Sequence, residues 1–406
     1  MPPLLRDPAF RAFLAANVLE RFASAALTVL LGFQVYELTH DPLDLGWLGL
    51  AEAAPGVTLV LYGGHVADRH PRRRIVLAAT ACLAVLAGGL TLASGTGRVL
   101  PILYAVAFLA GVVRAFENPA ASGLEAHVVP LAQVIPGLAL LATTGRLADV
   151  LGPAVGGFAW AALGPQGTYL ALAALFAASC LLLLGVPEPP VPTATHDAGA
   201  LRSIRDGVAY VFRDQVLLGS MALDLFAVFF GGATALLPVF ATSILHVGPA
   251  GFGLLRSAAA AGSLTAALLA RRLLPRRRAG QALHWVIAGF GAAMVVFGLS
   301  RSLPLSLLAL FAAGLCDGTS VVIRRAILRL ASPEAMRGRI AAVKSVFVGS
   351  SNEIGAFESG VAASLLGASA AVWAGGLVTV GIVALTAWCA PRLRRLDLVE
   401  LAEAAR

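Results

Sequence analysis

Residues 64–74 read GHVADRHPRRR, a short basic segment between two apolar runs at 44–64 and 75–94. Each run has the ~20 mostly apolar residues that a helix needs to cross a bilayer. Short loops rich in arginine and lysine stay on the cytoplasmic side of a membrane. The segment therefore predicts two membrane-spanning helices joined by a cytoplasmic loop, and the same pattern recurs along the chain.

The composition fits a membrane protein. Of the 406 residues, 58% are hydrophobic and 13% are charged, whereas soluble domains carry about 25% charged residues. The apolar runs are continuous and do not alternate with a period of two, which predicts helices rather than a β-barrel. The net charge of +8 comes from basic residues in short loops, so we do not expect nucleic-acid binding.

Twelve spans are predicted, with basic residues concentrated in the even-numbered loops and the C-terminal tail. This asymmetry places both termini in the cytoplasm, and we expect a multi-pass protein of the bacterial inner membrane. The spans lie near 10–38, 44–64, 75–94, 101–120, 137–161, 168–186, 216–242, 250–270, 281–299, 303–326, 341–365 and 369–390.

A Pro-rich polar stretch after Val186 divides the chain. We expect an N-terminal six-helix bundle at 1–186, a cytoplasmic linker with an amphipathic helix at 187–214, and a C-terminal bundle with a short tail at 215–406. The halves match at an offset of about 204 residues, where Glu20 corresponds to Asp224. The sequence therefore predicts two pseudo-symmetric bundles that form a parallel repeat.

Charged residues inside the spans indicate which helices surround a polar interior. A charge at the middle of a membrane costs at least ~2.5–3.5 kcal/mol, so such side chains face protein or water. Spans three, six and twelve have no charged residue, and span nine has only a histidine. We therefore expect these four helices outermost and the other eight around a cavity. Candidate cavity and substrate residues are Arg21, Glu52, Arg114, Glu117, Asn118, Arg146, Asp149, Arg256, Asn352 and Glu358.

Spacing suggests partners for some of these charges. Arg114 and Glu117 are three residues apart, as are Arg146 and Asp149, so each pair can meet on one helix face. An acid without a partner in apolar surroundings binds a proton more readily than one in water. Structural ion pairs that hold helices together are the alternative for any single residue. The proton-coupling candidates are Asp224, Asp317, Glu20 and Glu353.

The loop at 64–74 resembles the conserved loop of the major facilitator superfamily, G-x-L-A-D-R-x-G-R-R/K, with Pro71 at the usual glycine. In that family the loop is thought to hold the two halves in one state, so the resemblance implies a gating role. Physically, the glycine permits close helix approach, the acid suits a helix N-terminus, and the arginines can pair with acids or carbonyl groups. The gating-loop candidates are Gly64, Asp68, Arg69, Arg72 and Arg73.

Two more segments resemble motifs of this family. Residues 114–118, RAFEN, partly match an R-x-x-Q-G element whose arginine is linked to proton transfer. Residues 152–157, GPAVGG, match the G-P-x-x-G-G core of a motif associated with antiporters, although Ala148 replaces its upstream glycine. The second match favours export, and ordinary small-residue packing is the alternative. Its residues are Gly152, Pro153, Gly156 and Gly157.

Residues 7–11 (DPAFR), 64–74 and 332–340 (SPEAMRGRI) look like the enterobactin-exporter group, which also resembles macrolide efflux pumps. The resemblance implies a monomeric secondary transporter in the lipid bilayer, with a small-molecule substrate and protons as partners. It would export an amphipathic siderophore or drug by alternating access. We expect no cofactor and no resident metal.

Other functions stay open. An importer or metal-ion carrier of the same fold is the main alternative, because carboxylates favour hard cations. A lipid flippase or a membrane sensor is less favoured; a sensor should carry a sizeable soluble output domain, and none is evident in this sequence. The sequence has no phosphate-binding loop, nucleophile elbow or metal-ligand spacing, so we do not expect an enzyme.

Overall fold

The computed structural model describes a chain whose regular structure is helical throughout the described residues. Contacts between residues divide the chain into two compact units, each described by itself below. Unit 1 consists of Met1–His40, Trp47–Thr195 and His246–Ser257, and unit 2 of Asp41–Gly46, His196–Leu245 and Ala258–Arg406. The described residues are 3–95, 99–130, 133–188, 208–231, 233–273, 275, 277–333, 336, 340 and 354–404.

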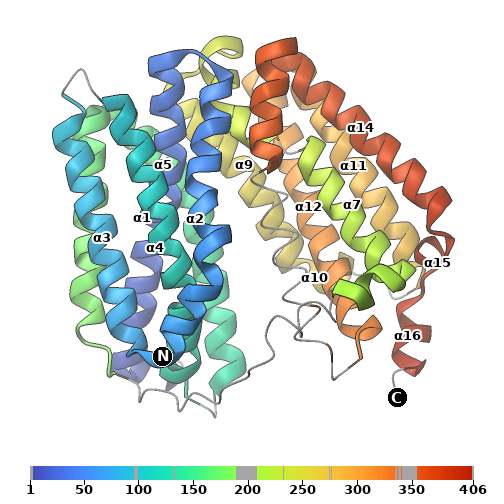
Figure 1. Cartoon of the computed structure of the whole chain (residues 1–406), viewed down its shortest axis with the longest axis horizontal. Coiled ribbons are helices and arrows are strands. Elements are labelled where there is room, and N and C mark those ends of the chain that lie inside the picture. Colours follow the sequence, from blue (N-terminus) through green and yellow to red (C-terminus); the bar gives the residue numbers. More distant parts are fainter. Residues whose placement is uncertain are drawn as a thin grey trace. The chain divides into compact units, whose positions relative to one another are not determined.

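The helices of unit 1 follow the predicted spans closely (Figure 1). The first begins where Asp7 accepts a hydrogen bond from the amide of Ala9 at 2.9 Å, with Pro8 at the first helical position, as expected for a helix start. The long helix α5 contains two predicted spans, which are separated at Gly164. The helices are α1 (Pro8–Thr39), α2 (Pro42–Arg69), α3 (Arg72–Ala93), α4 (Val99–Val128) and α5 (Val134–Leu183).

Most of the remaining helices belong to unit 2, while α9 begins in unit 1. The predicted span at 216–242 is broken into α7, a 3-10 turn η3, a short α8 and a π-helical turn η4. A further helix, Ile354–Leu366, precedes α14. The elements are α7 (Gln215–Gly231), η3 (Ala233–Leu236), α8 (Leu237–Val239), η4 (Phe240–Ile244), α9 (Gly248–Leu268), α10 (Ala270–Leu273), α11 (Ala279–Leu299), α12 (Leu303–Ala331), α14 (Ala368–Cys389), α15 (Pro391–Arg394) and α16 (Leu398–Ala404).

Seven of the described helices are long and apolar enough to cross a membrane. Three shorter apolar helices, Gln215–Ala227, Thr234–Ile244 and Ile354–Leu366, lie at or within other predicted spans. The predicted all-helical fold is confirmed for the described residues, and the total of twelve spans stays a prediction.

Two glycines with positive φ separate consecutive helices at equivalent places in the two halves. Gly164 (φ 67°, ψ −178°) divides α5, and Gly367 (φ 85°) precedes α14. A side chain with a Cβ rarely adopts these conformations, so glycine is required at both turns. The two glycines are 203 residues apart, which agrees with the predicted offset of the repeat.

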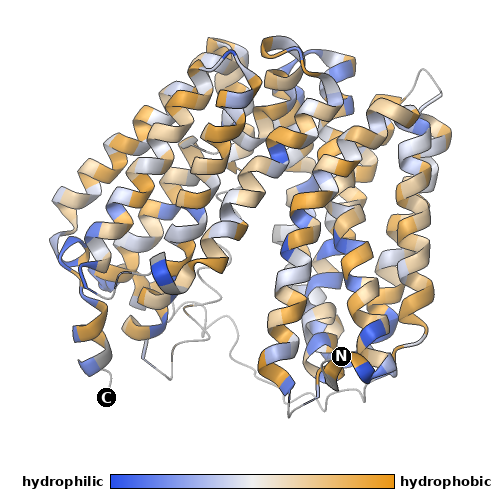
Figure 2. Ribbon diagram, turned by 180° about the vertical axis from the view of Figure 1, so that it is seen from behind, coloured by the Kyte–Doolittle hydropathy of each residue, from blue (hydrophilic) through white to orange (hydrophobic). Residues whose placement is uncertain are grey.

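Helices α3 and α14 expose large apolar side chains. Within unit 1, α3 packs against α4 and α5, and Val85 and Leu92 are 73% and 80% exposed. Within unit 2, α14 packs against α11 and α7 and exposes Leu377 and Trp388. Most of each helix is coloured as hydrophobic, and hydrophilic residues occupy short stretches between the hydrophobic ones (Figure 2). This agrees with the predicted lipid-facing place of spans three and twelve.

The predicted linker lies largely outside the described residues, which leave out 189–207. Residues 208–213 are helical and belong to the segment predicted to be amphipathic. The division into bundles at 1–186 and 215–406 stays a prediction. The short segment Asp41–Gly46 belongs to unit 2, and His246–Ser257 belongs to unit 1.

Candidate functional site

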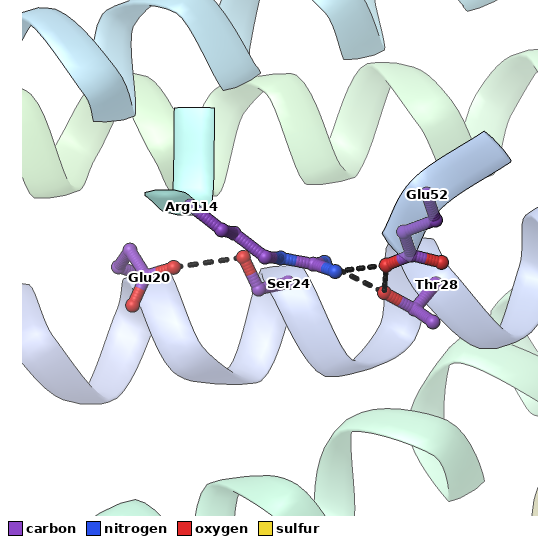
Figure 3. A network of polar contacts seen from close by, with 5 residues as sticks. All are labelled: Glu20, Ser24, Thr28, Glu52 and Arg114. Carbon is purple, nitrogen blue, oxygen red and sulfur yellow. Dashed lines mark hydrogen bonds and ion pairs between the residues drawn. The ribbon is translucent and has the colours of Figure 1, made fainter. Parts of the chain in front are cut away.

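The main polar cluster of unit 1 lies between α1, α2 and α4 (Figure 3). Glu20, Ser24 and Thr28 are four residues apart on α1 and therefore share one face. Arg114 of α4 forms an ion pair with Glu52 of α2, and its Nη2 donates a hydrogen bond to Thr28 Oγ1 at 2.7 Å. The cluster thus links three helices through one guanidinium group.

Hydroxyl groups complete this cluster on the α1 side. Ser24 Oγ donates to Glu20 Oε1 at 2.7 Å, and Thr28 Oγ1 donates to Glu52 Oε1 at 3.4 Å. Thr28 therefore accepts from Arg114 and donates to Glu52, so its hydroxyl is used in both directions.

Close backbone contact brings Arg114 and Glu52 together. A Cβ built at Gly111 of α4 meets the carbonyl oxygen of Glu52, and one built at Gly63 of α2 meets the carbonyl oxygen of Ala115. Only glycine allows this approach on each side, and Gly111 lies one turn before Arg114. The side chain of Arg114 therefore reaches Glu52 over a short path.

A third acid, Glu117, lies one turn beyond Arg114 on α4. It is 6% exposed, and its carboxyl group lies 3.5 Å from Thr80 Oγ1 of α3. Glu20 and Arg114 are its charged neighbours. Arg114 thus has three carboxyl groups as charged neighbours, those of Glu20, Glu52 and Glu117.

The predicted pairs within one helix are wrong. Arg114 forms its ion pair with Glu52 rather than with Glu117. Asp149 lies 3.3 Å from Nη2 of Arg21 on α1, and Arg146 is not its partner within 4.0 Å. In both cases the partner comes from a neighbouring helix, because long arginine side chains reach across the space between packed helices.

Unit 2 contains a corresponding ion pair between its helices. Asp224 of α7 pairs with Arg324 of α12, and their side chains are 10% and 6% exposed. Arg324 also donates to Ser320 Oγ at 2.9 Å and to the Ser320 carbonyl oxygen at 3.3 Å. The expectation that Asp224 has no partner is therefore wrong, while its role in proton coupling stays a prediction. Asp317 lies on the same helix, one turn before Ser320.

Arg256 of α9 differs from the other arginines of the cluster. It is partly buried and forms no hydrogen bond or ion pair with a described residue, although Glu52 is its charged neighbour. Both residues belong to unit 1. A cation held beside an acid but not bonded to it is available to an anionic or hydrogen-bond-accepting group.

The remaining cavity candidates are more dispersed. Arg146 and Glu358 are partly buried, and Asn118 is exposed. Asn352 and Glu353 lie outside the described residues.

The predicted gating loop joins α2 to α3 and attaches to unit 1 through its arginines. Arg73 donates to the carbonyl oxygens of Leu183 and Leu184 at 3.0 and 2.8 Å, which caps the end of α5. Arg72 donates to the Gly123 carbonyl at 3.2 Å and lies 3.7 Å from Asp68. These contacts agree with the expectation that the arginines bind acids and carbonyl ends.

Two expectations about this loop need correction. No described atom lies within 4 Å of a Cβ built at Gly64, so the close helix approach falls on Gly63 instead. Asp68 lies in the last turn of α2, and no side chain caps the start of α3. Arg69 is exposed at the end of α2. The gating role of the loop stays a prediction.

The GPAVGG segment lies where α5 contacts α1 and α9. A Cβ at Gly152 would lie 2.7 Å from the Phe22 carbonyl oxygen, and one at Gly156 would lie 3.1 Å from Ala26 Cβ. On the α9 side, a Cβ at Gly157 would lie 3.1 Å from Gly253 Cα, and one at Gly253 would meet the Pro153 carbonyl oxygen. Ser257 Oγ also donates to the Val150 carbonyl at 2.6 Å. The segment therefore serves close packing, and its antiporter role stays a prediction.

Sequence reasoning missed the hydroxyl partners Ser24, Thr28 and Thr80. The four-residue spacing of Glu20, Ser24 and Thr28 is visible in the sequence and places them on one helix face. No comparable signal marks Thr80, because its contact with Glu117 depends on how α3 and α4 pack. Among the described residues, no group of three His, Cys, Asp or Glu side chains is arranged to hold a metal ion.

Comparison with known proteins identifies the class. The sequence model of the Major Facilitator Superfamily matches residues 13–299, more than half of the chain. The chain therefore belongs to the Major Facilitator Superfamily and is a multi-pass membrane transporter.

Particular relatives narrow this class. Enterobactin exporter EntS of Citrobacter koseri is 26% identical over 387 residues, covering 94% of this chain and 92% of the relative. Enterobactin exporter EntS of Shigella flexneri is 25% identical over 389 residues, with the same coverage of 94% and 92%. The chain is thus similar to enterobactin exporters over nearly its whole length.

Solved structures support the fold. A POT family transporter in complex with a thioalcohol conjugated peptide has a TM-score of 0.74 and 13% identity, over 95% of this chain and 96% of that chain. A D-xylose-proton symporter has a TM-score of 0.73 and 16% identity, over 96% and 99%. At these identities the likeness shows the major facilitator fold alone.

Proposed function

We propose that the chain is a secondary transporter that exports a small amphipathic organic solute, of which enterobactin is the first to test, in exchange for protons. The similarity to enterobactin exporters over 94% of the chain supports both the direction and the substrate. Like other members of its superfamily, the protein would expose one binding site alternately to the two sides of the membrane.

The observation that carries this proposal is the charged cluster of Glu20, Glu52 and Arg114 among apolar helices. Charges are kept inside a membrane protein mainly where they serve a pathway or hold helices together. This cluster joins α1, α2 and α4 and lies beside Arg256, which has no bonded partner among the described residues. It therefore offers both a cation for a polar solute and carboxyl groups that can exchange protons.

The proposal includes an orientation. The protein lies in the bacterial inner membrane with both termini in the cytoplasm and acts as a monomer. The distribution of arginines between the even-numbered and odd-numbered loops supports this orientation.

Secretion from whole cells tests the proposed function. The chain is expressed in a bacterial strain that makes enterobactin but lacks its own exporter, and enterobactin in the medium is measured by mass spectrometry. We expect secretion to rise above that of cells with an empty vector. An Arg114→Ala variant should secrete no more than the vector, because Glu52 then loses its ion-pair partner.

Amounts of protein in the membrane are compared by immunoblot, so that poor expression is distinguished from poor transport. Secretion at the level of the empty vector, with normal amounts of the wild-type chain in the membrane, would rule out enterobactin export. The same assay with macrolides would then test the related drug substrates.

A further inference from the structure

The charges of the polar cluster in unit 1 do not balance. Arg114 faces three carboxyl groups, those of Glu20, Glu52 and Glu117, and Arg256 faces Glu52. Arg21 also lies near Glu20 but is bound to Asp149, so these two charges offset each other. If every group is ionised, the five residues carry one excess negative charge. A single bound proton makes the cluster neutral, which a membrane interior favours.

Two of the three acids have partners that suit the ionised form. Glu52 is paired with Arg114, accepts a hydrogen bond from Thr28 and faces Arg256. Glu20 accepts a hydrogen bond from Ser24 at 2.7 Å and has Arg114 as a charged neighbour. Hydrogen bonds and cations of this kind stabilise a carboxylate.

Glu117 has a different environment. Among the described residues, its one hydrogen-bond contact is with Thr80 Oγ1, at 3.5 Å. The Thr80 hydroxyl has one hydrogen and two nearby acceptors, and its contact with the Val76 carbonyl oxygen, at 2.9 Å, is shorter than that with Glu117. A hydroxyl donates only once but accepts twice. With its hydrogen in the shorter of the two contacts, Thr80 meets Glu117 as an acceptor, and this arrangement fits a Glu117 that carries a proton and donates it.

The other groups around Glu117 agree with a neutral carboxyl. From α1 it faces the acid Glu20, and from α5 the thiol of Cys180. From its own helix it faces Arg114, whose ion pair is with Glu52 of α2. A buried carboxylate here would compete with Glu52 and Glu20 for the same guanidinium.

We propose that Glu117 holds the exchanged proton, and that losing this proton shifts Arg114 from Glu52 toward Glu117. In this step the O–H bond of Glu117 breaks and the proton leaves to water. Arg114 then replaces the proton as the counter-charge, since it lies one turn away on the same helix. The link between α4 and α2 weakens as Glu52 loses Arg114. This inference rests on the proposed proton-coupled export.

Infrared spectroscopy of the purified, membrane-reconstituted protein tests the protonation directly. A protonated carboxylic acid has a C=O band separate from those of carboxylates and amides, and the band shifts in heavy water. We expect this band in the wild type, its loss in Glu117→Gln, and its retention in the control Glu400→Gln, which changes an exposed acid on α16 outside the cluster. Thr80→Val should shift the band because the acceptor oxygen is removed, whereas Thr80→Ser should leave it in place.

The outcomes separate the inference from the proposed function. A band that survives in Glu117→Gln, or an unchanged band in Thr80→Val, overturns the inference whatever the protein transports. Loss in Glu117→Gln alone, together with the Thr80→Val shift, supports the protonation site. Thermal unfolding of each variant in detergent shows whether it is folded. If Glu117→Gln does not fold, Glu117→Asp is measured in its place and should show a C=O band of a protonated carboxylic acid.

Proton release tests the exchange itself, with enterobactin as the probe. We expect enterobactin to release about one proton per protein from the wild type, measured with a pH-indicator dye in weak buffer, and none from Glu117→Gln. Equal release from both overturns the assignment to Glu117. If the wild type binds enterobactin without releasing protons while the infrared results hold, proton-coupled exchange fails although Glu117 is protonated.

Discussion

Removing Asp224 should destabilise unit 2 strongly, because it leaves Arg324 buried without its counter-charge. Both side chains are almost fully buried, and among the described residues Arg324 would keep only its two hydrogen bonds to Ser320. Breaking a buried ion pair by removing one partner costs about 3–5 kcal/mol. The cost of a single charge at mid-membrane, ~2.5–3.5 kcal/mol, is similar. We therefore expect Asp224→Ala to lose about 3–5 kcal/mol of unfolding free energy, roughly a 100- to 4,000-fold change in equilibrium constant.

Reversible unfolding in mixed detergent micelles, followed by circular dichroism, measures this loss. The double variant Asp224→Ala/Arg324→Met should recover most of the stability, since it removes both charges and fills the space with an apolar side chain. Glu400→Ala is the matched control, because Glu400 is an exposed acid on α16. Its effect should stay within about 0.5 kcal/mol.

An Asp224→Ala variant whose unfolding free energy lies within about 1 kcal/mol of the wild-type value would refute a stabilising role of the ion pair, because a loss of at least ~3 kcal/mol is expected. This role is also refuted if the double variant is as unstable as the single one, because the loss would then not come from an unpaired Arg324.

Three further substitutions test other parts of the account. Gly253→Val should slow transport into vesicles, because the valine side chain would meet the α5 backbone. Gly88→Val is the control and should change the transport rate little, because its Cβ meets no described atom. Arg73→Ala should lower the unfolding free energy by about 1.5–3 kcal/mol through lost charged hydrogen bonds, whereas exposed Arg69→Ala should not. Arg256→Ala should raise the enterobactin concentration needed for half-maximal binding about tenfold, the effect of losing ~1.4 kcal/mol, and unchanged binding in a fluorescence titration would count against a substrate contact.

The helices could be predicted from the sequence because each apolar run is long and ends at a recognisable change in composition. The structure starts α1 at Pro8 and ends it at Thr39, close to the predicted 10–38. The repeat was also visible, and the positive φ angles at Gly164 and Gly367 follow it. The break of span seven was not predicted because its hydropathy stays high, although Gly231-Gly232 and Pro238 are residues that can interrupt a helix.

The charged residues of the site could be predicted, but not their partners. Spacing along one helix suggested Arg114 with Glu117, whereas packing at Gly111 brings Glu52 of another helix closer. Asp224 likewise gained a partner from α12, 100 residues later in the chain. Such pairs depend on the rotation and depth of each helix, and one sequence does not determine these.

The central claim, proton-driven export, is tested most directly by enterobactin uptake into inverted membrane vesicles that contain the chain. Export from cells corresponds to uptake in this orientation. We predict accumulation when the vesicle interior is acidified, and its loss when an uncoupler collapses the pH gradient. Accumulation that persists without the gradient would contradict the account.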